Sequence, residues 1–342
     1  MLTLAVSLLF SAPQDWVYKS DLGFVDLDTM QRRSPAEFFK HGEQLRQAGR
    51  PEEAAQVFTL IREHVPDLAL REAAHFEAAE TWFKAASFDN AYREYETFVV
   101  RYPQSDRATQ AKRMELSSAL ALARAGRSTG VFGLSIASSS KPGIEFLKAS
   151  LRRYPREEFT ADFIQRLGKF HFERGDWDAA ADQFQLILDQ YADAPDAVLA
   201  LWMLGVTSEA RFSSVEYDIK PLKDARRHYE RFLEEAEKMR RLPEPARRWV
   251  DEIQGSVEKR LERVYDLMLE KARRTVKYYE WKGLPKAALL YHKAILKDLV
   301  SYRRVLPQFP RREAEADARA ALQAAGVPLP AVSPARPDEG KK

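Results

Sequence analysis

Residues 36–66 read AEFFKHGEQLRQAGRPEEAAQVFTLIREHVP, and this stretch decides the fold. Small and aromatic residues recur in it at fixed intervals, in the order Gly42, Gly49, Ala54, Phe58 and Pro66. A small residue on each of two helices lets antiparallel helices approach closely, and an aromatic ring one turn later fills the space beside them. Glycine is typical of the end of the first helix and proline of the end of the second. The stretch therefore predicts one helical hairpin.

The same pattern recurs along the chain. Residues 162–192 place Gly168, Gly175 and Ala180 at the equivalent positions, followed by an aromatic ring, and residues 72–103 place three alanines there. This spacing is typical of the tetratricopeptide repeat, a helix-turn-helix unit of about 34 residues. We therefore predict an all-α fold, a right-handed superhelical solenoid of about five to six helical hairpins in which strands are nearly absent.

Further hairpins along the chain are less regular. Residues 126–140 separate two helices predicted around residues 110–125 and 141–154. Residues 245–282 contain only one glycine and no internal proline, which predicts a single long helix. The predicted organisation is a signal-like segment and N-terminal extension over residues 1–33, the solenoid over residues 34–305, and a helix fragment with a proline-rich, disordered tail over residues 306–342.

Charge and composition argue against several classes of function. Lys and Arg number 54 and Asp and Glu 51, so the net charge of +3 gives no basic field of the kind that binds nucleic acid. Cysteine is absent, and no two of the six histidines stand four residues apart, so we expect no metal site. No phosphate-binding loop, dinucleotide fingerprint or serine-nucleophile motif occurs. We expect neither a cofactor nor enzymatic activity.

The first residues resemble an export signal. Residues 2–10 form an apolar run of about signal-peptide length, followed by Ser11, Ala12 and Pro13. No Lys or Arg precedes the run, and a cut after Ala12 would place bulky Phe10 at the third residue before the bond. Export, with or without cleavage, is the favoured interpretation. A buried N-terminal strap or a misassigned start is the alternative.

The second half of the chain resembles a particular family. Residues 201–205, LWMLG, precede Glu216-Tyr217-Asp218 and a helix with alanine and tyrosine four residues apart. Residues 272–283, ARRTVKYYEWKG, lead through a glycine turn into a further helix. These features, over about residues 162–301, resemble the third and final repeats of the outer-membrane assembly lipoprotein family called BamD.

The resemblance implies a non-enzymatic scaffold on the periplasmic face of the outer membrane. In that family the N-terminal repeats receive substrate and the C-terminal repeats contact the barrel-bearing partner while β-barrel proteins are assembled into the outer membrane. Its members are usually tethered through an acylated cysteine, which this chain lacks, and have one hairpin fewer than predicted here. A general periplasmic or cytoplasmic adaptor in another protein complex is the alternative.

The first helix of each hairpin supplies the candidate binding surface. Aromatic and charged residues alternate on the face of these helices that we predict to line the concave side, a composition suited to an extended peptide. The candidates are Phe39, Glu43, Arg46, Phe76, Glu80, Phe83, Gln165, Lys169 and Phe172. In the alternative interpretation, the Phe rings fill the interfaces between repeats and the charges are merely solvated.

Two loops are further candidates for partner contact. Val131, Phe132 and Leu134 are large apolar residues in a stretch rich in Gly and Ser, where a solvated connection would be polar. They contact a protein partner or a membrane surface in one interpretation and fold back over the solenoid in the other. Tyr217 and Asp218, from the family-like motif, form the second candidate loop.

Overall fold

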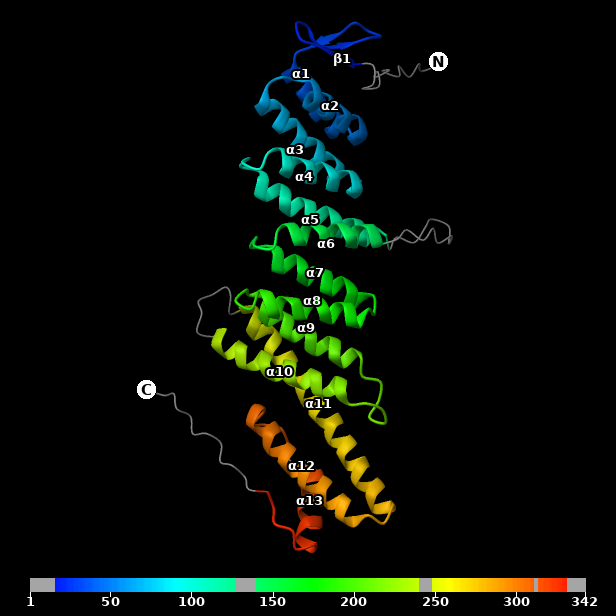
Figure 1. The fold of residues 1–342 in the computed structure, drawn as a ribbon, viewed down its shortest axis with the longest axis vertical. Coiled ribbons are helices and arrows are strands. Elements are labelled where there is room, and N and C mark those ends of the chain that lie inside the picture. Colours follow the sequence, from blue (N-terminus) through cyan, green and yellow to red (C-terminus); the bar gives the residue numbers. More distant parts are fainter. Residues whose placement is uncertain (1–15, 127–139, 240–247, 311–312, 331–342) are drawn as a thin grey trace, which may run out of the picture. The chain divides into compact units, whose positions relative to one another are not determined.

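The computed structural model describes residues 16–126, 140–239, 248–310 and 313–330 (Figure 1). The contacts divide the chain into two compact units, one ending at Phe163 and one beginning at Ile164. The first unit contains, in chain order, β1 Trp16–Lys19, β2 Gly23–Asp26, β3 Arg32–Arg33, α1 Pro35–Gln47, α2 Pro51–His64, α3 Leu68–Lys84, α4 Phe88–Arg101, α5 Ala108–Ala125 and α6 Lys141–Arg153.

The second unit is entirely helical in the part that is described. The helix α7, Thr160–Glu173, spans the boundary between the units. It is followed by α8 Trp177–Gln190, α9 Asp196–Ala210, α10 Lys220–Met239, α11 Arg248–Trp281, α12 Pro285–Val305 and α13 Glu313–Ala324. The predicted helices over residues 110–125, 141–154 and 245–282 are thus confirmed as α5, α6 and α11, and α11 alone is 34 residues long.

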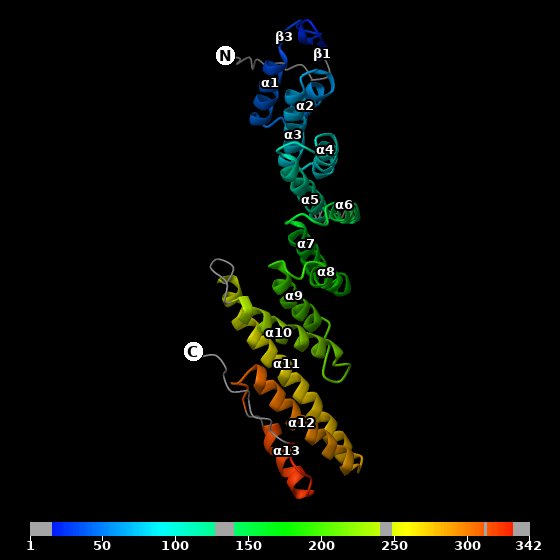
Figure 2. The ribbon, with the colours of Figure 1, turned by 60° about the vertical axis from the view of Figure 1, so that its left-hand side comes forward.

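Within each unit, helices pack mainly on their neighbours in the sequence. In the first unit α1 packs on α2 and the succession continues to α6, and in the second unit it runs from α8 to α13. Figures 1 and 2 both show α1 to α6 as successive antiparallel pairs. Contacts confined to sequence neighbours are the mark of a repeat array. The prediction of an all-α solenoid of helical hairpins is therefore confirmed, with six hairpins from α1–α2 to α11–α12 among the described residues.

Contacts between glycine and an aromatic ring hold the two helices of a hairpin close together. A Cβ atom added at Gly42 would lie 2.9 Å from the ring of Phe58, and one added at Gly168 would lie 2.6 Å from the ring of Phe184. Both rings are completely buried. The spacing of small and aromatic residues in the sequence therefore has the physical basis that we expected.

The turns between the paired helices need a left-handed backbone. Gly49, Gly175 and Gly283 have φ angles of +76°, +77° and +67°, which glycine adopts without steric cost. The turn between α3 and α4 has Ala86 at the same place, with φ +58°. Because its Cβ crowds the backbone in this conformation, Ala86 is a strained position in an otherwise regular hairpin.

A small antiparallel sheet precedes the first helix, and its three strands of two to four residues are the only strands among the described residues, so strands are nearly absent there, as expected. Val17 of β1 lies opposite Val25 of β2, and β2 pairs in turn with β3. Phe24 is fully buried, and its ring stacks on Phe38 of α1 with ring centroids 4.1 Å apart. The sheet therefore covers one side of the first hairpin.

Candidate protein-interaction site

A groove of about 430 Å³ lies in the second unit, on the side formed by the first helices of three hairpins. The helices α7, α9 and α11 supply most of its lining, and the connection from α9 to α10 together with Leu222 of α10 completes it. Its lining residues are Phe172, Val206, Glu209, Ala210, Phe212, Ser213, Leu222, Arg260, Arg263 and Leu267. Most of these side chains are apolar, and three are charged. A groove with this lining can accept apolar side chains and hold a few polar groups in place.

One end of the groove carries a fixed set of charges. The carboxylate of Glu209 accepts a hydrogen bond from the Tyr229 hydroxyl and pairs with the Arg260 guanidinium at 2.9 Å. Burial, together with the hydrogen bond to Glu209, raises the pKa of Tyr229 above its usual range, so this phenol remains a donor. The charge of Glu209 is therefore already satisfied from within the protein.

Arg263 is the charge that remains available. It lies three residues after Arg260 on α11, its side chain is exposed, and it forms no ion pair with any residue that the structure describes. A guanidinium beside an apolar surface binds carboxylates through paired hydrogen bonds. The groove can thus recognise an acidic group next to an apolar side chain.

The predicted surface residues on α1 form contacts within the protein. Phe39 meets the edge of the Phe58 ring, with centroids 5.1 Å apart. Arg46 forms a 2.5 Å ion pair with Glu77 of α3. Glu43 is half-buried. This helix therefore has an ion pair to the next hairpin where we predicted open binding groups.

The candidates on α3 divide between core and surface. Phe76 is only 5% exposed, and its ring packs against those of Tyr95 and Phe98. Its place on an exposed concave face is therefore a wrong expectation, because this side chain fills the interior of the hairpin. Glu80 accepts a 2.8 Å hydrogen bond from the Tyr95 hydroxyl. Phe83 is half-buried against Phe88.

The candidates on α7 differ in exposure, and one of them reaches the groove. Gln165 is half-buried, and its side-chain oxygen has no hydrogen-bond partner within the described part of the chain. Lys169 is exposed. Phe172 lines the groove and meets the edge of the Trp177 ring, with centroids 5.0 Å apart. Of the nine predicted surface residues, Phe172 is the one that the structure brings to this hollow.

The two candidate loops have different outcomes. Val131, Phe132 and Leu134 lie outside the described residues. Tyr217 is 72% exposed. The Asp218 carboxylate accepts a 2.8 Å hydrogen bond from the backbone N–H of Lys220, at the first residue of α10, so Asp218 stabilises the start of that helix.

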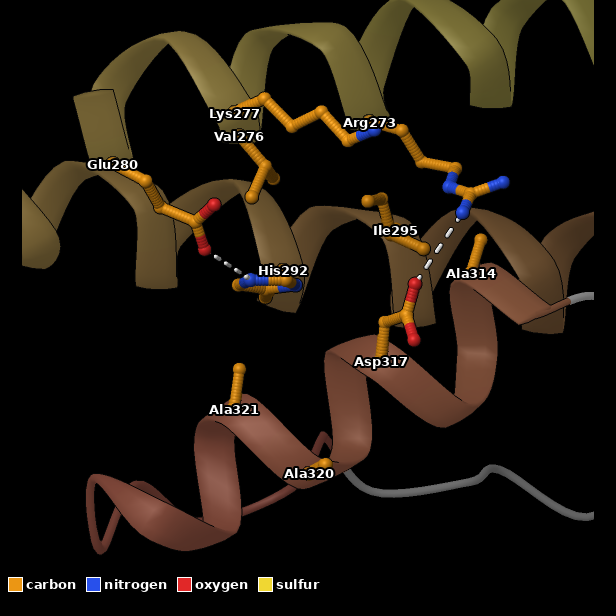
Figure 3. Close-up of a pocket in the computed structure, with 10 residues that line it drawn as sticks. All are labelled: Arg273, Val276, Lys277, Glu280, His292, Ile295, Ala314, Asp317, Ala320 and Ala321. Atoms are coloured by element: carbon orange, nitrogen blue, oxygen red, sulfur yellow. Dashed lines mark hydrogen bonds and ion pairs between the residues drawn. The ribbon is translucent and has the colours of Figure 1, made fainter.

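Sequence reasoning missed a second pocket, of about 350 Å³, between α11, α12 and α13 (Figure 3). Arg273 extends across its mouth to Asp317 at 3.4 Å and to Glu313 at 2.9 Å. His292, almost fully buried, has its Nε2 atom 3.7 Å from Glu280. Figure 3 shows the pair of Arg273 and Asp317 and the pair of Glu280 and His292 at different places along the pocket. Arg273 is thus held by two carboxylates of this chain, while Lys277, which also lines the pocket, is exposed and forms no ion pair with a described residue.

A third polar cluster joins three helices around a carboxylate that is closed to solvent. Glu115 of α5 is fully buried and accepts hydrogen bonds from Ser150 at 2.5 Å and from Tyr154 at 2.6 Å. Arg153 of α6 pairs with Glu115 and also with Glu96 of α4. Burial raises the pKa of Glu115 despite these partners. The cluster can join α4, α5 and α6, and its central carboxylate, Glu115, is too deeply buried for a ligand to reach it directly.

Among the described residues, no group of three or more His, Asp or Glu side chains is arranged to hold a metal ion. None of the described helices has both the length and the apolar character that crossing a membrane requires.

The packing of helices on their neighbours in the sequence defines a helical-repeat protein, and in its second unit the groove lies along the first helices of three hairpins. Residues 164–194, which contain most of α7 and all of α8, match the tetratricopeptide repeat family. The six helical hairpins among the described residues are consistent with a solenoid of such repeats. Repeats of this family generally mediate protein–protein interaction and are generally not enzymatic. Comparison with curated proteins found no match.

Proposed function

We propose that this chain is a non-enzymatic scaffold that binds an extended segment of a partner protein in the groove between α7, α9 and α11. The observation that carries this proposal is the combination of an apolar lining with Arg263, which has no ion pair among the described residues. Extended peptides gain affinity from side chains that enter pockets and specificity from a few polar contacts. The preferred segment has an aliphatic or aromatic side chain beside an Asp or Glu.

The groove binds such a segment without rearranging its own charges. Glu209 is held by Tyr229 and Arg260, so it does not repel an incoming acidic group as an unpaired carboxylate would. Phe172 and Leu267, both half-buried, provide apolar surface for the neighbouring side chain. Arg263 is left to pair with the acidic group.

For the cellular role, we propose a scaffold of the cell envelope that binds protein partners or unfolded substrates during assembly of β-barrel proteins into the outer membrane. The support is the resemblance of residues 201–205 and 272–283 to the BamD family, together with the apolar run at residues 2–10. The proposed location is the periplasm or the periplasmic face of the outer membrane. The alternative is a general periplasmic or cytoplasmic adaptor in another protein complex. Fractionation of cells that express the full chain separates these locations.

The peptide proposal is tested with an array of synthetic 15-residue peptides that cover outer-membrane β-barrel sequences, followed by fluorescence anisotropy on the peptides retained. We expect the retained peptides to combine an apolar residue with an acidic neighbour. Arg263→Glu should weaken their binding at least tenfold, about 1.4 kcal/mol, because it places a like charge opposite the acidic group.

Lys259→Glu is the matched control, since Lys259 is an exposed cation on the same helix that does not line the groove. It should leave the affinities within about twofold, a change typical of a surface substitution. Equal affinities for the Arg263→Glu variant and the unaltered protein would show that the peptides bind elsewhere.

A further inference from the structure

The tip of the last hairpin exposes an unusual amount of apolar surface. We define the hairpin tip as residues 277–293, which contain the end of α11, the turn at Gly283 and the start of α12 (Figure 1). Trp281 is 78% exposed, Leu290 69% and Leu284 52%. Tyr278 and Tyr291 add two partly exposed rings. Soluble surfaces show single residues of this kind, but a cluster that includes a tryptophan indicates an interaction site.

The hairpin tip is also strongly basic. It holds four lysines and one glutamate, so its net charge of +3 equals that of the whole 342-residue chain. All four lysines are exposed, and none forms an ion pair with a described residue. The single acidic residue, Glu280, faces His292 at 3.7 Å. The positive charge of the hairpin tip is therefore exposed and is not neutralised by ion pairs to its lysines from the described residues.

The aromatic rings and the lysines lie together. The ammonium group of Lys282 lies 5.1 Å from the centroid of the Trp281 ring and 5.8 Å from that of Tyr278. Tyr279 of α11 stacks on Tyr291 of α12, with centroids 5.4 Å apart, and so joins the two helices beside the turn. One compact surface thus offers amphipathic rings, aliphatic side chains and cations.

We infer that the hairpin tip is a docking site for an anionic lipid surface. Tryptophan and tyrosine favour the boundary between headgroups and acyl chains, where the ring is partly buried and its polar atom stays wet. Lysine ammonium groups remain at the level of the phosphates while their stems cover apolar surface. Protein interfaces, by contrast, are depleted in lysine and place their principal aromatic contacts in pockets. This inference does not depend on the groove or on its peptide.

The test is co-sedimentation of the full chain with vesicles of phosphatidylcholine alone or with about 30% phosphatidylglycerol. We expect binding to the anionic vesicles, and expect it to weaken as salt screens the lysines. Each lysine near such a surface contributes about fivefold to the partition coefficient, so Lys282→Glu with Lys286→Glu should lower it by at least about 25-fold. Trp281→Ala with Leu284→Ser should lower it at least tenfold through the lost apolar contact.

Matched controls separate the hairpin tip from general charge and hydrophobicity. Lys40→Glu with Lys148→Glu changes the net charge equally at two exposed lysines elsewhere, and Leu68→Ser with Val100→Ser removes two exposed apolar side chains elsewhere. Both control proteins should bind anionic vesicles like the unaltered chain.

Three results would overturn the inference. The first is that the unaltered chain binds neither kind of vesicle. The second is that the two tip variants bind like the controls. In the third, the unaltered chain does not co-sediment with vesicles, and light scattering shows that it self-associates while the tip variants do not. That result would assign the hairpin tip to contact with a second copy of this chain. Circular dichroism of each variant verifies that the substitutions leave the helices intact.

Discussion

The α7–α8 hairpin and the polar cluster of α4, α5 and α6 hold their helices together in opposite ways. In the hairpin, the close contact depends on a missing side chain, since Gly168 leaves room for the ring of Phe184. In the cluster, a fully buried carboxylate, Glu115, is matched by a guanidinium and two hydroxyl groups. The first contact depends on steric fit between a glycine and a ring, and it recurs at Gly42 and Phe58. The second needs complementary polar groups from separate helices, and these do not stand at the positions of the small and aromatic residues that define the repeat pattern.

The largest expected effect comes from removing the cation of the polar cluster. Arg153→Met leaves Glu115 buried without its counter-charge and should lower the free energy of unfolding by about 2–3 kcal/mol, less than for a fully buried pair because Arg153 is partly exposed. Urea denaturation measures this loss. Arg152→Met is the control, since Arg152 is an exposed neighbour that forms no ion pair with a described residue, and should change stability by less than about 0.5 kcal/mol.

The same variant should show a specific pH dependence. Burial already raises the pKa of Glu115 above that of the unfolded chain, and loss of Arg153 raises it further. A carboxyl group with a raised folded-state pKa takes up its proton more readily when folded, so the stability lost by Arg153→Met should shrink as the pH falls from about 7 to 5. A loss that stays constant over this range would show that the cation contributes mainly through packing.

The next prediction tests the steric contact between Gly168 and Phe184. Gly168→Ala should cost about 1–2 kcal/mol, because the new methyl group would have to displace the buried ring of Phe184. Gly255→Ala is the counterpart in α11, where a Cβ meets no atom within 4 Å, and should gain about 1 kcal/mol from helix propensity. Thermal and urea unfolding of both variants decide the matter. Equal changes in stability at the two positions would show that the close contact of Gly168 with Phe184 does not stabilise the hairpin.

The smallest expected effect concerns the turn between α3 and α4. Ala86→Gly relieves a left-handed alanine, and the larger entropy of the unfolded glycine chain offsets part of this gain, so stability should rise by about 0.5–1 kcal/mol. Gly175→Ala, the reverse change at φ +77°, should lower it by about 1 kcal/mol. Loss of stability in both variants would indicate that the Ala86 side chain contributes contacts that outweigh its backbone strain.

Residue spacing predicted the hairpins because their contacts are local. The interval from Gly168 to Phe184 spans one hairpin, and each partner can be recognised by its size alone. The polar cluster was not predicted, because Glu115 stands in α5 among other helical polar residues and its partners lie 35 or more positions further along the chain. The N-terminal sheet was missed because its strands are only two to four residues long, too short for an alternating pattern to stand out.

The binding surface was predictable only in part. Phe76 and Phe172 each stand on the first helix of a hairpin, and both were predicted to be exposed to a partner. The structure buries Phe76 against Tyr95 and Phe98 and leaves Phe172 at the groove. Successive residues of a helix point about 100° apart. A small error in the assumed face therefore places a core residue on the surface. Arg260 and Arg263 were not predicted, because mixed charges on α11 resemble an ordinary solvated face.

The small sheet at the start of the chain has a consequence for how the array can grow. A stack of similar units can in principle lengthen indefinitely, since every new unit meets the same kind of surface as the one before. In the first hairpin, α1–α2, Phe24 of the sheet already covers the side where Phe38 lies. Whole hairpins can thus be duplicated within the array, whereas the sheet covers the apolar surface of the first hairpin. A chain without residues 16–33 would expose that surface, including Phe38, to other molecules.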